Sequence, residues 1–381
     1  MDKKRFLFSA VVTYYMVYLT IMSLVPDTGL SASLGDTLLS STVTKSYVND
    51  FPKFMKTKEF EDLDYDTRDR LASEYLFKEG KKIYDCVNRG NDTKKCFSFK
   101  KDVIYSKTKY RDEDMVMKYP HQYNLLINNP DACAGNPRVV IGSPVGPRQY
   151  LERMGTRKSW GSVKEVDGVK VLHLFFVGQD ENDPVGDRML REESERYHDI
   201  IQFDMKNHFM NLTLLAILTY NWTDVYCPNI QYYVRSDNDM WFNPYRFVSS
   251  FLMVDRTNSL MGNKIAHGQP IRVGYSRYYL SKTVFPAEVF DPYMSGCFLA
   301  MTRDVLHTIV ERCVDIGPII YFDDVFLGQI AKIAGITLVP FPYYKVSYTP
   351  IAYSGEKYSK IWAVHRYTPT DNVALWQIAS L

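Results

Sequence analysis

From residue 138 onward, short apolar runs alternate with segments of helical periodicity. Residues 169–177 form a nearly continuous apolar run, which is typical of a strand covered on both faces. This alternation predicts an α/β layered domain with a mainly parallel sheet, in which ligands bind at the carboxyl ends of the strands. The other predicted strands are 138–141, 200–203 and 230–234, and the predicted helices are 148–158, 189–197 and 211–222.

The composition fits a folded chain that does not bind nucleic acid. Its 381 residues are 46% hydrophobic and 14% aromatic, which suffices for one large domain or two ordinary ones. The formal net charge is only +2 and the basic residues are spread out, so there is no basic stripe for nucleic acid. Neither a GxGxxG nor a GxxxxGK[ST] motif occurs, which disfavours dinucleotide and P-loop sites.

The N-terminus predicts a membrane anchor. Three of residues 1–5 are basic, and residues 6–25 contain no charged side chain over a length that matches a bilayer. The positive-inside rule makes residues 1–5 a cytosolic tail and residues 6–25 a transmembrane signal anchor, with the rest of the chain beyond the membrane. A cleaved signal peptide is the alternative, although its apolar stretch is usually only ~7–15 residues long.

Composition divides the remainder of the chain into four parts. Residues 26–65 are interpreted as a stem, because their first half is rich in Ser, Thr and Gly and poor in aromatics. A helix is predicted at 66–79, with Gly80 as its end. The parts after the stem are a membrane-proximal subdomain at 66–137, the α/β domain at 138–350 and a C-terminal extension at 351–381.

Cysteines and sequons agree with an oxidising compartment. The six cysteines could form up to three disulfides, and Cys86 with Cys96 is the first pairing to expect because the two are close in sequence. The sequence has no CxxC spacing and no Cys/His cluster that would predict a zinc site. N-glycosylation sequons begin at Asn91, Asn211 and Asn221.

An acidic triplet after the predicted strand 230–234 is the strongest local signal for chemistry. Asp237 and Asp239 flank Asn238 where the strand opens into a loop. Oxygen ligands at such a place suit a hard divalent cation, which could neutralise a departing nucleotide diphosphate. A polar turn with solvated acids is the alternative.

The loop 142–148 and the helix after it supply a second candidate. Its Gly and Pro residues let the backbone approach a ligand closely. Arg153 and Arg157 share a helix face, and their guanidinium groups could contact phosphate. A solvated helix face is the alternative.

Two segments near the C-terminus complete the set. In 290–300, small residues beside aromatics could form a wall for a sugar ring, with a tight turn into a core strand as the alternative. In 321–328, Asp323 and Asp324 lie within an apolar stretch. Either carboxylate could be a general base or could cap a helix that Gly335 would end.

Taken in order, these segments resemble the β-1,3-galactosyltransferase and β-1,3-N-acetylglucosaminyltransferase family, glycosyltransferase family 31. The resemblance spans about residues 138–335, and the ordered set is more specific than any one motif. Its blocks are the Arg-rich stretch 148–161, Phe175-Phe176-Val177-Gly178, Asp199-Ile200-Ile201-Gln202, Asn211-Leu212-Thr213, Cys227-Pro228, Arg235-Ser236-Asp237-Asn238-Asp239, 290–296 and 323–328.

The resemblance implies a fold and a chemistry. It implies a GT-A-like, Rossmann-type nucleotide-sugar transferase domain and an inverting, UDP-sugar-dependent hexosyltransferase. Asp239 would ligate Mn²⁺, and Asp237 would help to bind either the metal or the ribose of the nucleotide. Asp324 would be the general base, with Asp323 as the second candidate. The implied UDP-sugar-binding residues are Ser143, Arg148, Arg153, Arg157, Asp237, Tyr293 and Gly296.

The resemblance also implies partners and a location. The donor would be a UDP-hexose or UDP-N-acetylhexosamine, and the acceptor a glycan hydroxyl on protein or lipid, joined through a β-1,3 linkage. The anchor and stem would make the chain a single-pass type II protein of the Golgi membrane with a lumenal catalytic domain.

Two other classes remain open. Asn238 and Trp241 depart from the family pattern, which allows a catalytically inactive, membrane-tethered sugar-binding protein of the same fold. A metal-dependent phosphotransferase or hydrolase could use the same acids.

Overall fold

The computed structural model describes residues 50–90, 92–100, 109, 116–117 and 123–379. The chain divides into two compact units, Met1–Asp64 and Tyr65–Leu381. The predicted cytosolic tail, the predicted anchor and stem residues 26–49 lie outside the described residues. Within the described ranges, no helix has the length and apolarity that crossing a bilayer requires.

The described part of the first unit is a pair of short helices. These are α4 (Phe51–Phe54) and α5 (Lys58–Glu61), and the Thr57 hydroxyl caps α5 by accepting from the Phe60 N–H. The rings of Phe51, Phe54 and Phe60 pack together with centroids 5.5–6.1 Å apart.

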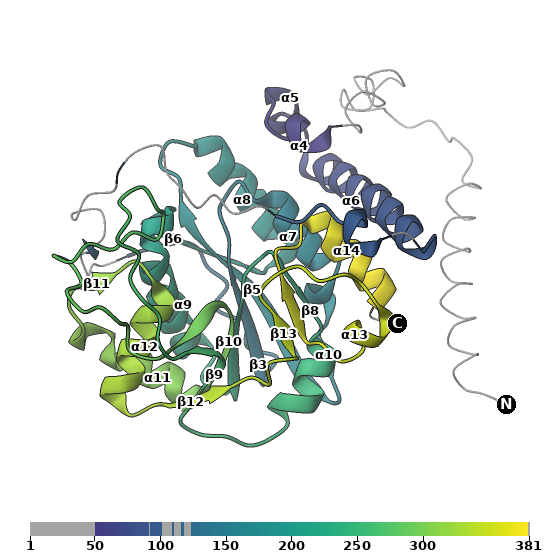
Figure 1. Cartoon of the computed structure of the whole chain (residues 1–381). Coiled ribbons are helices and arrows are strands. Elements are labelled where there is room, and N and C mark those ends of the chain that lie inside the picture. The colour runs from purple at the N-terminus through teal and green to yellow at the C-terminus, as the bar shows by residue number, and fades with distance from the viewer. Residues whose placement is uncertain (1–49, 91, 101–108, 110–115, 118–122, 380–381) are drawn as a thin grey trace, which may run out of the picture. The chain divides into compact units, whose positions relative to one another are not determined.

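A mixed nine-stranded sheet forms the centre of the second unit (Figure 1). Its four central strands are mutually parallel, whereas β10 runs antiparallel to both of its neighbours. The prediction of a mainly parallel sheet therefore holds for the central strands and for the edge pair of β12 with β9, whereas the other pairs are antiparallel. The strand order is β12 (Thr337–Pro340), β9 (Ser259–Ile265), β10 (Tyr293–Thr302), β7 (Tyr232–Ser236), β3 (Val139–Pro144), β5 (Val169–Gln179), β6 (Ile200–Lys206) and β2 (Leu125–Ile127), with β4 (Glu165–Val166) paired to β5.

Two smaller sheets and a set of helices complete this unit. One small sheet pairs β1 (Val116–Met117) with β11 (Ile319–Ile320), and the other joins β13 (Val346–Ser347), β14 (Ala363–His365) and β8 (Met240–Phe242). The longer helices are α6 (Tyr65–Asn88), α7 (Tyr150–Arg157), α8 (Pro184–Tyr197), α9 (Leu212–Tyr226), α11 (Arg303–Arg312), α12 (Asp323–Ala334) and α14 (Pro369–Ala379); α10 (Pro244–Phe247) and α13 (Gly355–Tyr358) are single turns.

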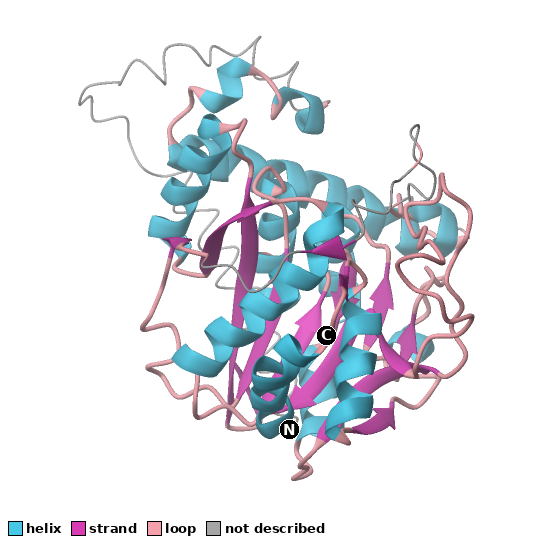
Figure 2. Ribbon diagram, turned by 90° about the vertical axis from the view of Figure 1, so that its left-hand side faces the viewer, coloured by secondary structure: helices cyan, strands magenta, loops and turns pink. Residues whose placement is uncertain are grey.

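The central strands are apolar because both faces of the sheet are covered. Along β3, Val140 belongs to the core that includes α9, α11 and α12, whereas Val139 and Ile141 belong to the core on the opposite face. Figures 1 and 2 show helices on the two sides of the strands. All six strands and helices predicted between residues 138 and 222, and the strand before the acids, are present, and the Gly335 end of α12 is confirmed by its left-handed φ of 66°.

The order of the parallel strands creates a crevice. The chain runs from β3 to β5 and β6, and then returns to β7 on the other side of β3. The segment after β3 and the turn after β7 meet at this point, where Asn238 Nδ2 donates to Gln149 Oε1 at 3.2 Å. Ligands in α/β sheets bind at such a switch point.

One expectation from the sequence is wrong. Gly80 does not end its helix: α6 continues to Asn88, and a Cβ on Gly80 would contact α14 at 3.5 Å, so the glycine lets the two helices pack closely. The described residues of 66–137 and 351–381 belong to the same compact unit as the sheet. Helix α6 packs on α14, and β14 pairs with β8.

Candidate active site

The acidic triplet lies on a tight turn between β7 and β8 at this crevice. The Met240 N–H donates to the Asp237 carbonyl at 3.2 Å, which closes the turn. The Asp237 N–H donates to the Cys297 carbonyl of β10 at 2.9 Å, which fixes the turn against the sheet. Backbone hydrogen bonds thus fix the turn that carries the two carboxylates at the carboxyl end of β7.

A histidine from the C-terminal region completes a three-residue cluster. Strand β14 pairs antiparallel with β8 and places His365 opposite Met240. Its Nε2 lies 3.1 Å from Asp239 Oδ1. One ligand atom from each of Asp237, Asp239 and His365 lies within 4.8 Å of the others. We call these three residues the Asp–Asp–His cluster.

The donor set of this cluster fits a divalent cation. Carboxylate oxygens suit Mg²⁺ and Mn²⁺, and an added imidazole nitrogen favours a transition ion such as Mn²⁺ over Mg²⁺. The electrostatics agree, because two acids held this close repel each other unless a cation lies between them. Burial raises the pKa of Asp237, with Arg235 opposing the effect.

The other two members of the cluster form a charged pair. Burial acts to raise the pKa of Asp239, but the hydrogen bond from His365 and the charges of His365 and Lys100 outweigh it, so the net pKa is lowered. Burial likewise acts to lower the pKa of His365, but Asp239 and Cys297 outweigh it and raise the pKa to about 11. A protonated His365 therefore neutralises Asp239 in the absence of a metal.

The cluster opens into a cleft of about 670 Å³. The cleft is bordered by the loop after β3 on one side and by the segment around Tyr278 on another. Its polar lining suits a ligand that carries charges and hydroxyl groups. The lining residues are Lys100, Pro144, Val145, Gly146, Pro147, Arg148, Gln149, Asp180, Asn207, His208, Phe209, Leu212, Leu215, Arg235, Asp237, Asn238, Asp239, Arg277, Tyr278 and His365.

Arg235, the fourth residue of β7, contacts one acid from each of two pairs: Asp237 of the acidic triplet and Asp323 of α12. Its guanidinium group lies 3.4 Å from Asp237 Oδ1 and forms an ion pair with Asp323. Asp323 is buried and is committed to this ion pair. Of the two predicted candidates for a general base, Asp324 is therefore the stronger.

Asp324 is half-buried in the first turn of α12. Its two carboxylate oxygens accept from the Val325 N–H at 2.8 Å and from the Gly296 N–H at 3.2 Å. Burial raises the pKa of Asp324, which moves this carboxyl toward the range where a base can take up a proton. A Cβ on Gly296 would lie 3.2 Å from the Asp324 Cβ, so the glycine keeps space beside the carboxylate.

Arg153 and Arg157, which the sequence predicted to contact phosphate, are not among the residues that line the cleft. Both side chains point away from the cleft, into an ion cluster with Glu193 and Asp199 of neighbouring elements. Arg153 is 1% exposed, and its remaining donors bind the carbonyls of Gly146 and Pro147. Arg153 thus holds the loop after β3, and Arg157 joins α7 to Glu193 and Asp199.

Of three other residues predicted to bind the donor, only Arg148 lines the cleft. Ser143 is fully buried and does not line the cleft, and its hydroxyl lies 3.0 Å from His173 Nε2. Arg148 lines the cleft and pairs with Asp183. Tyr293 does not line the cleft but lies near Asp324: burial, with the charge of Asp324, raises the pKa of Tyr293 to about 12.

Sequence reasoning missed two cleft residues that contact Asp239. His365 lies 126 positions after it, and only the pairing of β14 with β8 brings it to the cluster. Lys100 comes from the opposite end of the chain. Neither residue belongs to a local motif, so no spacing rule could have found them.

The cysteines and sequons have the following positions. The predicted Cys86–Cys96 disulfide is confirmed, and a second one joins Cys133 to Cys227. Among the described residues, Cys297 and Cys313 are the cysteines outside these two disulfides. Of the predicted glycosylation sites, Asn221 is exposed on α9, Asn211 is half-buried at its start, and Asn91 lies outside the described residues.

Comparison with known proteins identifies the family. The Galactosyltransferase family model matches residues 152–342. Beta-1,3-galactosyltransferase 1 of Mus musculus is 28% identical over 261 residues, which cover 68% of this chain and 78% of the relative. Beta-1,3-galactosyltransferase 2 of Homo sapiens is 27% identical over 266 residues, which cover 68% of this chain and 63% of the relative.

A solved glycosyltransferase involved in the glycosylation of the major capsid of PBCV-1 superimposes on 63% of this chain and on all of its own, with 11% identity and a TM-score of 0.34, a likeness too loose to define a fold. The family model, in contrast, covers half of the 381 residues and includes both acidic pairs. The chain therefore belongs to the galactosyltransferase family, as the ordered sequence blocks predicted.

Proposed function

We propose that this chain is an inverting β-1,3-glycosyltransferase with a GT-A-like domain, and that it transfers a sugar from a UDP-sugar to a glycan hydroxyl on protein or lipid. The observation that carries this proposal is the Asp–Asp–His cluster in the lining of a polar cleft, joined through Arg235 to Asp323, the neighbour of Asp324. Because the relatives are named β-1,3-galactosyltransferases, UDP-galactose is the first donor to test.

In this proposal the Asp–Asp–His cluster holds Mn²⁺. A cation held by these residues would supply positive charge that neutralises the negative charge developing on the UDP leaving group. Asp237 and Asp239 would supply carboxylate oxygens and His365 its Nε2. The donor set supports Mn²⁺ because it mixes oxygen and nitrogen ligands.

The acceptor side of the reaction is assigned to Asp324. Its carboxylate would accept the proton of the attacking hydroxyl while the sugar–phosphate bond breaks on the opposite face of the sugar. Arg235 would keep Asp323 ionised. Because it pairs with both acids, it would also hold Asp237 at a fixed distance from the N-terminus of α12. Gly296 would leave room for the acceptor beside Asp324.

The proposed setting is the Golgi lumen, with the chain anchored as a single-pass type II protein. The two disulfides support an oxidising compartment. The apolar, uncharged stretch at residues 6–25 and the basic residues before it support the anchor.

A UDP-release assay tests the proposal. The protein from residue 50 onward, secreted from a eukaryotic host, is incubated with Mn²⁺, an acceptor panel and either UDP-galactose or UDP-N-acetylglucosamine. We expect acceptor-dependent UDP release that Asp239→Asn abolishes, and mass spectrometry of the product identifies the added sugar. Sugar binding without UDP release would instead favour an inactive sugar-binding protein, and full-rate UDP release without acceptor would favour a hydrolase.

A further inference from the structure

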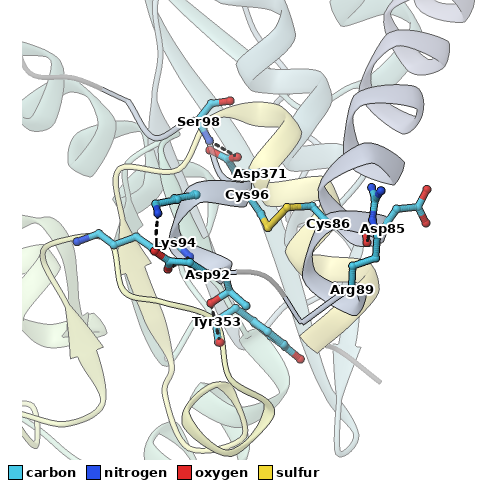
Figure 3. Close-up of a disulfide and its surroundings, with 11 residues drawn as sticks. Asp85, Cys86, Arg89, Asp92, Lys94, Cys96, Ser98, Tyr353 and Asp371 are labelled. Carbon is cyan, nitrogen blue, oxygen red and sulfur yellow. Dashed lines mark hydrogen bonds and ion pairs between the residues drawn. A yellow bond between two sulfur atoms is a disulfide. The ribbon is translucent and has the colours of Figure 1, made fainter.

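A short segment at residues 96–100, which we call the strap, carries a lysine into the cleft. At its start, the Cys86–Cys96 disulfide joins the strap to α6 (Figure 3). At its end, the Lys100 N–H donates to the Arg366 carbonyl at 2.8 Å, directly after β14. The strap is therefore held against the same strand that supplies the histidine of the cluster.

The middle of the strap is fixed by a buried carboxylate. Asp371 of α14 is 0% exposed and accepts from the Ser98 N–H at 3.0 Å and the Phe99 N–H at 3.1 Å (Figure 3). Phe97 is buried against the ring of Tyr367, with centroids 5.6 Å apart. With both ends and the middle held, the strap places the backbone of Lys100 beside β14, from where its long side chain can reach the cluster.

The Lys100 side chain ends at the acidic turn. Its Nζ lies 3.3 Å from Asp239 Oδ2 and 3.5 Å from Asn238 Oδ1. The other oxygen of Asp239 contacts His365. Both oxygens of Asp239 therefore already have a cationic partner, and a metal that binds Asp239 must compete with Lys100.

Lys100 is also suited to contact phosphate. A diphosphate needs cationic partners, and Arg153 and Arg157 are buried away from the cleft. Among the cleft cations, Arg235 is held between Asp237 and Asp323. The Lys100 side chain is 41% exposed, so its ammonium group can swing on its flexible four-carbon stem.

We propose that Lys100 is a resident counter-ion of the Asp–Asp–His cluster that turns from Asp239 to the diphosphate of the nucleotide donor when a divalent cation is bound. The inference rests on the proposed function and adds a residue outside the matched family region to its donor site. It also gives the Cys86–Cys96 disulfide a role, namely to hold the strap that presents Lys100.

The proposal predicts two effects of opposite sign for Lys100→Met. Without nucleotide, Mn²⁺ should bind roughly two- to fivefold more tightly, because the competing ion pair is partly exposed and of modest strength. With saturating Mn²⁺, UDP should bind about tenfold more weakly, because a charge-assisted hydrogen bond to phosphate is lost. A merely structural lysine would weaken both ligands together.

The experiment measures Mn²⁺ binding by electron paramagnetic resonance and UDP binding by calorimetry, on wild type, Lys100→Met and Lys100→Arg. Lys94→Met is the matched control, since Lys94 is an exposed lysine on the turn just before the strap. We expect Lys100→Arg to behave like wild type and the control to change neither affinity. The proposal is overturned if Lys100→Met leaves Mn²⁺ affinity unchanged or lowers it, or if UDP affinity does not fall. If wild type binds neither Mn²⁺ nor UDP, the proposed function fails as well, so the two failures are distinguishable.

Discussion

Replacing Glu193 by Gln tests whether Arg153 and Arg157 are structural. The Glu193 side chain is 1% exposed and receives Arg153 Nε at 2.8 Å, Arg153 Nη2 at 2.7 Å and Arg157 Nη1 at 2.5 Å. Glutamine keeps the volume but removes the negative charge, which leaves a buried cation without its full partner. Because Arg153 also binds two carbonyls of the loop after β3, the damage should reach the cleft edge.

The magnitude follows from the burial. Removing one partner of a buried ion pair costs about 3–5 kcal/mol of the free energy of unfolding, whereas an exposed pair is worth about 0–1 kcal/mol. Burial acts to raise the pKa of Glu193, but the two arginines outweigh it and lower the pKa. A carboxyl with a lowered folded pKa stabilises the protein above its unfolded pKa and loses that contribution as the pH falls through the folded value.

Urea unfolding at pH 7 measures this loss, with Glu195→Gln as control because Glu195 is exposed on the same helix. We expect Glu193→Gln to be destabilised by about 3–5 kcal/mol and the control by less than about 0.5 kcal/mol. The difference between wild type and Glu193→Gln should shrink as the pH is lowered into the acid range. A Glu193→Gln protein of wild-type stability that has lost UDP binding would refute the structural assignment.

Three further outcomes are expected. Asp324→Asn should lower kcat about 10²–10⁴-fold with little change in UDP affinity; a variant with wild-type turnover would exclude Asp324 as the base. Because burial raises the pKa of Asp324, the rate of the wild type should fall as the pH drops through a value above that of an ordinary Asp, and a flat acid profile down to pH 4 would contradict this. Gly155→Ala should destabilise the protein by about 1–3 kcal/mol, because the new Cβ would lie 2.7 Å from the Pro369 Cβ, whereas Gly135→Ala, with nothing within 4 Å, should be near neutral in thermal unfolding.

Local patterns predicted the parts of the site that are local. Asp237 and Asp239 follow a strand by only a few residues, so the strand pattern alone placed them at a sheet edge. The same holds for Asp323 and Asp324, which begin a helix that Gly335 ends. Short-range spacing also sufficed for the Cys86–Cys96 pairing.

Long-range contacts were beyond such patterns. The i, i+4 spacing of Arg153 and Arg157 correctly placed them on one face of α7, but nothing in it says that this face meets Glu193 instead of the cleft. His365 reaches the cluster only through strand pairing, and Lys100 only through a disulfide-held strap. The residues that were missed are those whose position depends on packing between distant segments.

The central claim is that the Asp–Asp–His cluster holds a divalent cation that also contacts the donor diphosphate. Crystals soaked with Mn²⁺ and UDP, measured for anomalous scattering of manganese, test it directly. We predict one strong peak within bonding distance of Asp237 or Asp239 and of His365 Nε2, with diphosphate oxygens completing its coordination. A peak elsewhere, or UDP bound with these three side chains facing only solvent, would contradict the account.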